Sequence, residues 1–201
     1  MVFVALGLWW TWPTVRHPGL SLPGGSDGIL FDWYFEWVAQ SVVHGHDPFV
    51  SGALNAPAGV NLMWNAMMFL VSVLCIPFTL SIGPVVTVSL LMVLSPIISA
   101  SVAYWVFRRL SGRVVGSAIG AALYGFGPFT VGEFGHMQLI LAPFPPMLVL
   151  VGYRLLVEER GSAARTGVLL GVLVGIQLLI AEELVAMCVV ASAVALVWLA
   201  V

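Results

Sequence analysis

The chain lacks lysine and carries little charge of either sign. All seven basic residues are arginines, and charged residues make up 8% of the sequence. Ordinary soluble domains carry about 25% charged residues, so this composition excludes a soluble globular protein. The formal net charge is −2, and no basic patch argues for a nucleic-acid partner. What the chain does contain is apolar sequence, at 61% hydrophobic residues.

Cysteine is equally scarce. Cys75 and Cys188 both lie inside apolar runs. This placement predicts inert packing residues and argues against a disulfide framework or a metal site.

Several apolar runs approach the ~20 residues that a membrane-spanning helix needs. We therefore expect an all-α, polytopic transmembrane helix bundle that forms a single domain over residues 1–201. Both ends lie in apolar runs, so we expect the front part of a longer protein. The expected spans are about 1–15, 85–107, 114–131, 137–157, 166–181 and 184–201.

Arginine predicts the orientation. Two clusters of arginines are separated by two expected spans, so both clusters fall on the same face of the membrane. Positive clusters in short loops mark the cytoplasmic side. They are Arg108, Arg109 and Arg113, and Arg154, Arg160 and Arg165. The large first loop, about 16–82, then lies outside only if Met63–Ile82 enters the membrane and returns without crossing. Pro77 and Gly83-Pro84 favour such a broken segment.

Within that loop, the run from Gly28 to His44 predicts an amphipathic helix. Asp32, Glu36 and Gln40 recur every four residues and form one polar stripe. We expect this helix to lie at the membrane interface with its apolar side in lipid and its polar stripe facing away from lipid. The stripe could be an ordinary solvated face or part of a functional site.

Asp27 stands immediately before that helix. With Ser26 it could cap the start of the helix. Alternatively, its carboxylate looks into a cavity, and this second role makes it a candidate catalytic residue.

Two polar segments follow the helix. The string His44-Gly45-His46-Asp47 offers three potential metal ligands, but Gly and Asp-Pro favour a turn, and we predict no metal site. The segment 55–65 is rich in asparagine. The amides of Asn61 and Asn65 suit a ligand with many hydroxyl groups, although the same residues also favour a chain of turns.

A second polar group, Glu133, His136 and Gln138, occupies a short loop expected on the outer side. Polar residues at the lip of a membrane cavity are functional candidates, and the alternative is a hydrated loop between helices. Pro143, Pro145 and Pro146 follow, and they should leave backbone carbonyls free to bind a ligand or to be bridged.

Glycines at 167, 171 and 175 are spaced to let helices pack closely. Glu182 returns to nearly the same helix face, so we expect it to point into the bundle; otherwise it marks the turn between two spans. Asp27, Asp32, His136 and Glu182 are thus all predicted on one side of the membrane. A cavity that gathers acids and a histidine is typical of general acid–base chemistry.

Several strings resemble one group of proteins. They are the aspartate before an aromatic interfacial helix, His-Gly-x-x-Pro-Phe, Asn-Leu-Met-Trp-Asn, Gly-Phe-Gly-Pro and Gly-His-Met-Gln-Leu. Together they resemble actinobacterial polytopic membrane proteins of the GT-C glycosyltransferase superfamily, over roughly Asp27 to Glu183.

The resemblance implies transfer of a sugar from a polyprenyl-phosphate donor to a glycan or lipid acceptor, at the outer face of the bacterial cytoplasmic membrane. It places Asp27 as the catalytic base, with Asp32 as the second candidate. The cofactor stays open, with a divalent cation as one option. The residues that we expect to contact substrate are Glu36, Asn61, Asn65, His136, Gln138 and Glu182.

Two other hypotheses are kept. One is a transporter or flippase-like protein that uses Glu133, His136 and Glu182 as a proton or ion relay. The other is a non-catalytic membrane scaffold whose acids only decorate the interface.

Overall fold

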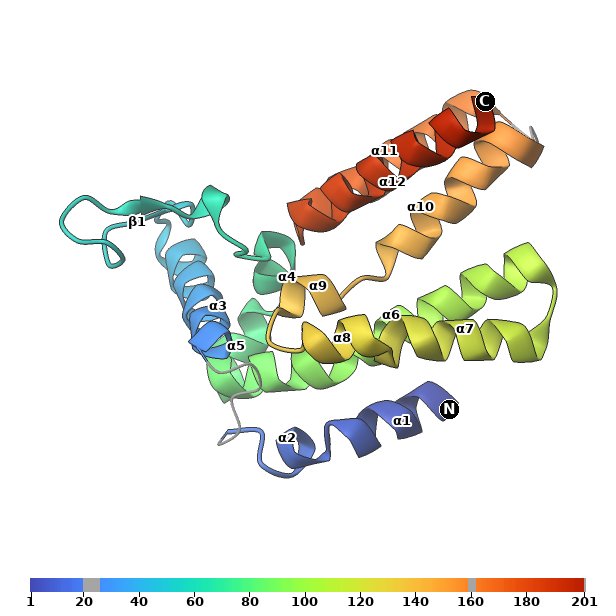
Figure 1. The fold of residues 1–201 in the computed structure, drawn as a ribbon. Helices are drawn as coiled ribbons and strands as arrows, with labels where there is room; N and C mark the ends of the chain where they lie inside the picture. Colours follow the sequence, from blue (N-terminus) through green and yellow to red (C-terminus); the bar gives the residue numbers. More distant parts are fainter. Residues whose placement is uncertain (20–25, 159–161, 201) are drawn as a thin grey trace.

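The computed structural model describes residues 1–19, 26–158 and 162–200, and these are mostly helical (Figure 1). Long helices run alongside one another in one part of the molecule, and shorter elements gather at one end. The later helices are α6 (Pro84–Ser111), α7 (Val114–Phe126), α8 (Pro128–Gly132), α9 (Met137–Ile140), α10 (Phe144–Tyr153), α11 (Ala163–Leu178) and α12 (Glu182–Ala200). The earlier helices are α1 (Val2–Trp10), α2 (Trp12–Arg16), α3 (Ser26–His44), α4 (Phe69–Leu74) and α5 (Ile76–Ile82).

Among the residues described, three helical stretches are long and apolar enough to cross a membrane. They are Pro84–Ser111, Val114–Gly132 and Met137–Glu158. Each overlaps an expected span, and α11 is apolar but shorter. These stretches mark the chain as a membrane protein.

The N-terminal apolar run does not form the single helix expected over 1–15. It is divided into α1 and α2 at Thr11, whose hydroxyl donates to the Gly7 carbonyl at 2.7 Å. Pro13 in the first turn of α2 has no N–H to continue the α1 ladder. α1 packs along α6.

The segment Met63–Ile82 is also not one spanning helix. A 3₁₀ turn, Leu62–Trp64 (η1), is followed by α4 and α5, which are separated at Cys75. Pro77 lies in the first turn of α5, where its missing N–H is harmless. Both helices pack against α3 and lie at the same end of the bundle as it does (Figure 1).

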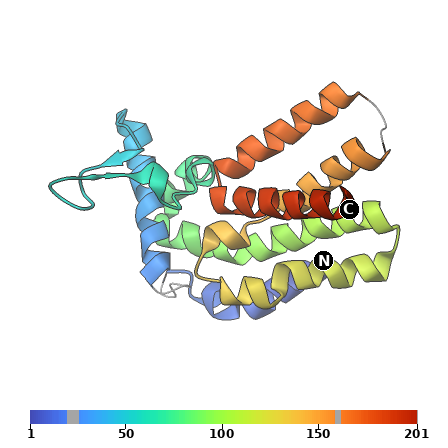
Figure 2. The ribbon, with the colours of Figure 1, turned by 45° about the horizontal axis from the view of Figure 1, so that its top comes forward.

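α3 runs across the ends of the long helices in both views (Figures 1 and 2). Its packed face carries Phe31, Tyr34, Phe35 and Val38, all nearly inaccessible and part of one core with residues from α4, α6, α9 and α12. Protein therefore covers the side of the helix that carries Tyr34 and Val38, whereas Ile29 and Leu30 of the expected apolar side remain exposed.

After α3 a short hairpin departs from the all-helical expectation. Strands β1 (Val50–Ser51) and β2 (Val60–Asn61) pair antiparallel, with Val50 opposite Asn61. The indole N–H of Trp37 donates to the Pro48 carbonyl at 3.1 Å and holds the hairpin against α3.

Close helix packing occurs at a different glycine from those predicted. A Cβ on Gly125 of α7 would lie 2.6 Å from the Ala100 Cβ and 2.7 Å from the Pro96 carbonyl of α6. By contrast, a Cβ on Gly167, Gly171 or Gly175 would meet nothing within 4 Å. The predicted glycine stripe of α11 is therefore not a tight helix interface in this structure.

Candidate functional site

A histidine between two carboxylates lies at the end of the bundle that carries α3. His136 Nε2 is 2.9 Å from Asp27 Oδ2, and His136 Nδ1 is 2.8 Å from Glu133 Oε2. We call Asp27, Glu133 and His136 the acid–imidazole cluster. Their side chains are 45%, 35% and 44% exposed, respectively. The structure thus joins Asp27 to His136, two residues predicted on the same side.

The local backbone structure explains why these three side chains lie close together. Asp27 lies in the first turn of α3, so the helix starts at Ser26 and not at the predicted Gly28. Glu133 closes α8 by donating its N–H to the Phe129 carbonyl at 2.8 Å. The His136 N–H then donates to the Glu133 carbonyl at 2.7 Å, and this tight turn places both side chains together.

The cluster has a definite electrostatic character. Each imidazole nitrogen faces a carboxylate oxygen, so protonated His136 would balance one of the two negative charges. The approach of Nδ1 to Glu133 is a charge contact without hydrogen-bond geometry. Because Asp27 is half exposed beside the imidazole, a hydroxyl group of a bound molecule could reach its carboxylate.

Asp32 has the opposite environment. It is only 9% exposed, and its Oδ1 atom is buried without a hydrogen-bond partner. Burial raises the pKa of this carboxyl group from 3.8 to about 6. The alternative of an ordinary solvated face therefore does not hold for Asp32, because this residue is buried, Glu36 is partly exposed and Gln40 is exposed.

Two buried glutamines add unsatisfied acceptors near the core. Gln138 in α9 is 5% exposed, and its Oε1 atom has no partner. Gln177 in α11 is fully buried, and its Oε1 atom also has no hydrogen-bond partner. Its Nε2 atom donates to the Ala181 carbonyl at 3.4 Å. Sequence analysis selected Gln138 and missed Gln177, which lies in a run that otherwise resembles a uniform apolar helix.

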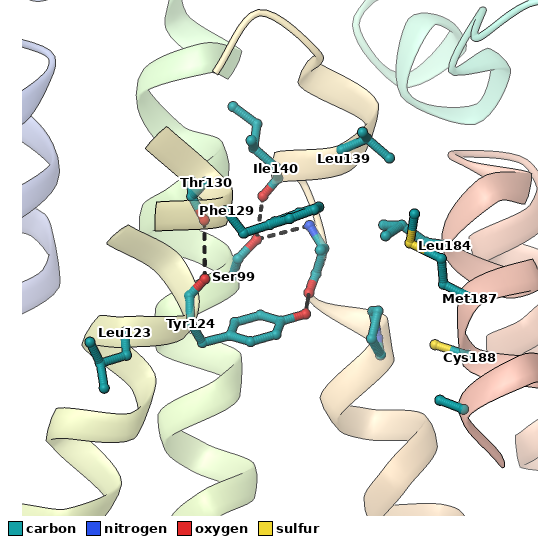
Figure 3. Close-up of a pocket in the computed structure, with 13 residues that line it drawn as sticks. Ser99, Leu123, Tyr124, Phe129, Thr130, Leu139, Ile140, Leu184, Met187 and Cys188 are labelled. Atoms are coloured by element: carbon teal, nitrogen blue, oxygen red, sulfur yellow. Dashed lines mark hydrogen bonds between the residues drawn. The ribbon is translucent and has the colours of Figure 1, made fainter. Parts of the chain in front are cut away.

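The segment between α9 and α10 interrupts the third span-length stretch, as the prolines predict. Ser99 of α6 donates its hydroxyl to the Ile140 carbonyl at 2.8 Å and accepts the Ala142 N–H at 2.9 Å. Tyr124 of α7 donates its hydroxyl to the Ala142 carbonyl at 2.7 Å (Figure 3). The freed backbone groups are thus bridged by side chains from neighbouring helices.

An open cavity of about 420 Å³ lies beside this bridge (Figure 3). Its polar groups are already bonded within the protein: Ser99 and Tyr124 hold the interrupted segment, and Thr130 donates to the Tyr124 carbonyl at 3.1 Å. The remaining lining is apolar and comes from Leu123, Phe129, Leu139, Ile140, Ala142, Pro145, Leu184, Met187, Cys188 and Ala191. Such a lining suits an apolar chain.

The cavity and the acid–imidazole cluster share one segment. α8 and α9 supply Phe129 and Leu139 to the cavity wall, and the turn that joins them supplies Glu133 and His136. A polar group and an apolar binding surface are therefore built from the same short stretch of chain.

The other predicted site residues lie outside the cluster. Glu36 accepts the Gln40 amide at 2.8 Å, and Asn61 uses its side-chain oxygen to accept the Met63 N–H at 2.9 Å. Asn61 thus has the turn-forming role that was kept as an alternative. Asn65 is partly exposed. Glu182 is exposed at the start of α12, so the expectation that it packs into the bundle on the glycine stripe is wrong.

The string around His46 forms a turn. Gly45 ends α3 at φ 69°, and the Asp47 carboxylate accepts the Phe49 N–H at 2.8 Å. Within the part of the chain that the structure describes, no group of three or more His, Cys, Asp or Glu residues is placed to hold a metal ion.

We compared the chain with known protein families, curated proteins and solved structures. No family model, no curated protein and no solved structure matches it.

Proposed function

We propose that the chain is a membrane glycosyltransferase that moves a sugar from a polyprenyl-phosphate donor to a glycan or lipid acceptor at the outer face of the bacterial cytoplasmic membrane. The observation that carries the proposal is the contact of Asp27 in α3 with His136, because the α8–α9 segment that supplies His136 also supplies Phe129 and Leu139 to the wall of an open apolar cavity. A lipid-linked sugar has matching parts, an apolar chain and a polar reacting end. The sequence strings that resemble GT-C enzymes support the same conclusion.

In this proposal, Asp27 is the base. Its carboxylate takes the proton of the acceptor hydroxyl, and the acceptor oxygen forms a bond to the anomeric carbon of the donor. The bond from that carbon to the phosphate oxygen breaks, and its electron pair leaves with the polyprenyl phosphate. His136 orients Asp27, and Glu133 orients His136 from the other nitrogen, as in other carboxylate–imidazole pairs.

A second function, proton or ion relay in a transporter, has one observation in its favour. An imidazole in contact with two carboxylates is a chain of groups that can exchange protons. The relay hypothesis also includes Glu182, but the structure gives that residue no ion pair with His136. This favours the transferase.

The activity is tested in proteoliposomes that contain the purified protein. We expect radiolabelled sugar to leave a polyprenyl-phosphate donor and to appear on an added acceptor, with no turnover of a nucleotide-sugar donor. The assay is run with and without EDTA to establish whether a divalent cation is required. Proton flux without sugar transfer would replace this proposal with the transporter, and absence of both would favour the scaffold.

The proposal includes a polytopic arrangement in which α3, α4 and α5 stay on the outer side. Cysteine labelling tests it in a background with Cys75 and Cys188 replaced by serine. Ala53 and Ala164 are exposed and therefore suit single-cysteine probes. Ala53→Cys should react with an impermeant maleimide from outside, and Ala164→Cys only after the membrane is opened. Reaction of both from one side would overturn the arrangement.

A further inference from the structure

Arginines gather at the end of the bundle opposite α3. The α6–α7 turn, the end of α10 and the start of α11 lie at the same end in both views (Figures 1 and 2). We call the described arginines near these points the arginine end. They are Arg108, Arg109, Arg113, Arg154 and Arg165. Arg160, predicted with them, lies outside the described residues.

None of these arginines forms an ion pair in the part of the chain that the structure describes, although Glu158 lies in the same short helical segment as Arg154. Both ion pairs found among the described residues involve His136, at the other end of the molecule. Arg108 donates to the Gly112 carbonyl, and the Arg109 guanidinium lies 4.7 Å from the centre of the Trp105 ring. Their partners are thus neutral, and the positive charge of this end is left for an external anion.

The surface next to these charges is apolar. Trp105 and Leu110 flank the α6 arginines and are exposed, as are Val114 and Val115 at the start of α7. Val157 is exposed in the π-helical turn Arg154–Glu158 (η2) after α10. A soluble polyanion would match the arginines but would leave this apolar surface unused.

We propose that the arginine end binds anionic phospholipids, with headgroup phosphates on the guanidinium groups and acyl chains along the exposed apolar side chains of α6 and α7. Guanidinium is suited to this contact because its planar set of donors can bind two phosphate oxygens at once. The inference is independent of the proposed sugar transfer, since it uses none of the residues of the acid–imidazole cluster.

The chain offers a matched control. Arg16 is exposed like Arg109 and Arg113, but it lies at the end of α2, on the side of the molecule that carries α3 (Figure 1). Removal of its charge changes the net charge by the same amount as loss of one charge from the arginine end.

The experiment titrates purified, delipidated protein in neutral detergent with dioleoyl-phosphatidylglycerol or dioleoyl-phosphatidylcholine and measures bound lipid by native mass spectrometry. We expect preferential binding of phosphatidylglycerol that weakens with salt. Arg109→Gln with Arg113→Gln should reduce that affinity by about fivefold for each arginine removed. Arg16→Gln should leave it unchanged, and Arg109→Lys with Arg113→Lys, which keep the charge but lose the paired donors, should have an affinity between those of the original protein and the glutamine pair.

Three outcomes would overturn the inference. They are equal binding of the two lipids, an equal loss in Arg16→Gln, or full displacement of phosphatidylglycerol by soluble polyphosphate. Thermal melting of each variant in the same detergent confirms that a loss of binding is not a loss of fold. If the glutamine pair fails to fold, the single variant Arg113→Gln gives the same comparison.

Discussion

Asp27 and Asp32 lie on the same helix, yet their carboxylates have opposite environments. Asp27, in the first turn of α3, is half exposed and contacts His136 at 2.9 Å. Asp32, five residues further on, is buried, and one of its oxygens has no hydrogen-bond partner. In the proposed reaction, Asp27 is the residue that exchanges a proton with the substrate. Asp32 instead lies on the covered face of α3.

This difference shows that the properties of a carboxylate on a helix depend on which part of the protein covers it. The packed face of α3 passes through Phe31 and Phe35, and Asp32 lies between them in sequence. Burial raises the pKa of Asp32 because the apolar surroundings disfavour its charged form. Asp27 instead extends past the covered face toward the α8–α9 turn.

The largest expected effect is on sugar transfer by Asp27→Asn. The substitution keeps the shape and hydrogen bonding of the side chain but removes its basicity, so turnover should fall by about 10²–10⁴-fold. Expression and membrane insertion should be unchanged. The matched control is Asp47→Asn, which alters a turn carboxylate after α3 and should transfer normally. Equal losses in both variants would point to a general effect of charge.

Asp32→Asn should change stability. Between about pH 4 and pH 6 the folded protein retains a proton on Asp32 that the unfolded chain has lost, so this group destabilises the fold as pH rises through that window. At pH 7 the variant should gain up to about 3 kcal/mol in free energy of unfolding relative to the original protein. At pH 4 the gain should vanish. Thermal unfolding in detergent at both pH values measures it, and a gain that is the same at pH 4 and pH 7 would contradict the role of burial.

Ser99→Ala tests the support of the segment that carries His136. The change leaves the Ile140 carbonyl without its donor and the Ala142 N–H without its acceptor in a buried place, which should cost about 1–3 kcal/mol of stability. Ser101→Ala is the control, since that exposed hydroxyl only returns to the Ile97 carbonyl of its own helix. Identical melting of the two variants would show that the bridge contributes little.

The smallest effect is expected for Glu133→Gln. Glu133 contacts the imidazole and not Asp27, so its loss should weaken the orientation of His136 and reduce turnover about tenfold, the rate equivalent of one lost interaction with a charged group. Glu183→Gln, which alters an exposed acid at the start of α12, should have no effect. A loss as large as that of Asp27→Asn would make Glu133 the base.

Much of the architecture could be predicted because hydropathy and proline act locally. The three span-length stretches follow from apolar runs, and the broken segments near Pro77 and Pro143 follow from the tendency of proline to begin a helix and not to continue one. The helix over 28–44 follows from its four-residue polar repeat. Arginine positions placed Asp27 and His136 on one side, which is necessary for their contact.

The predictions that the structure contradicts concern tertiary contacts, which the sequence pattern does not show. A polar stripe shows which residues share a helix face, but it does not show which neighbour covers that face, so the burial of Asp32 was missed. Glycine spacing likewise favoured α11, whereas the tight contact forms at Gly125, where Ala100 happens to face it. The partnership of Glu133 with His136 could have been noticed from their spacing of one helical turn.

The most direct test compares sugar transfer from a polyprenyl-phosphate donor by Asp27→Asn and Asp32→Asn in the same membranes, at matched protein levels and pH 7. If Asp27 is the base and Asp32 a buried structural acid, transfer should nearly disappear in the first variant and persist in the second. Near-normal transfer by Asp27→Asn together with loss in Asp32→Asn would move the catalytic role to the buried carboxylate and contradict the assignment.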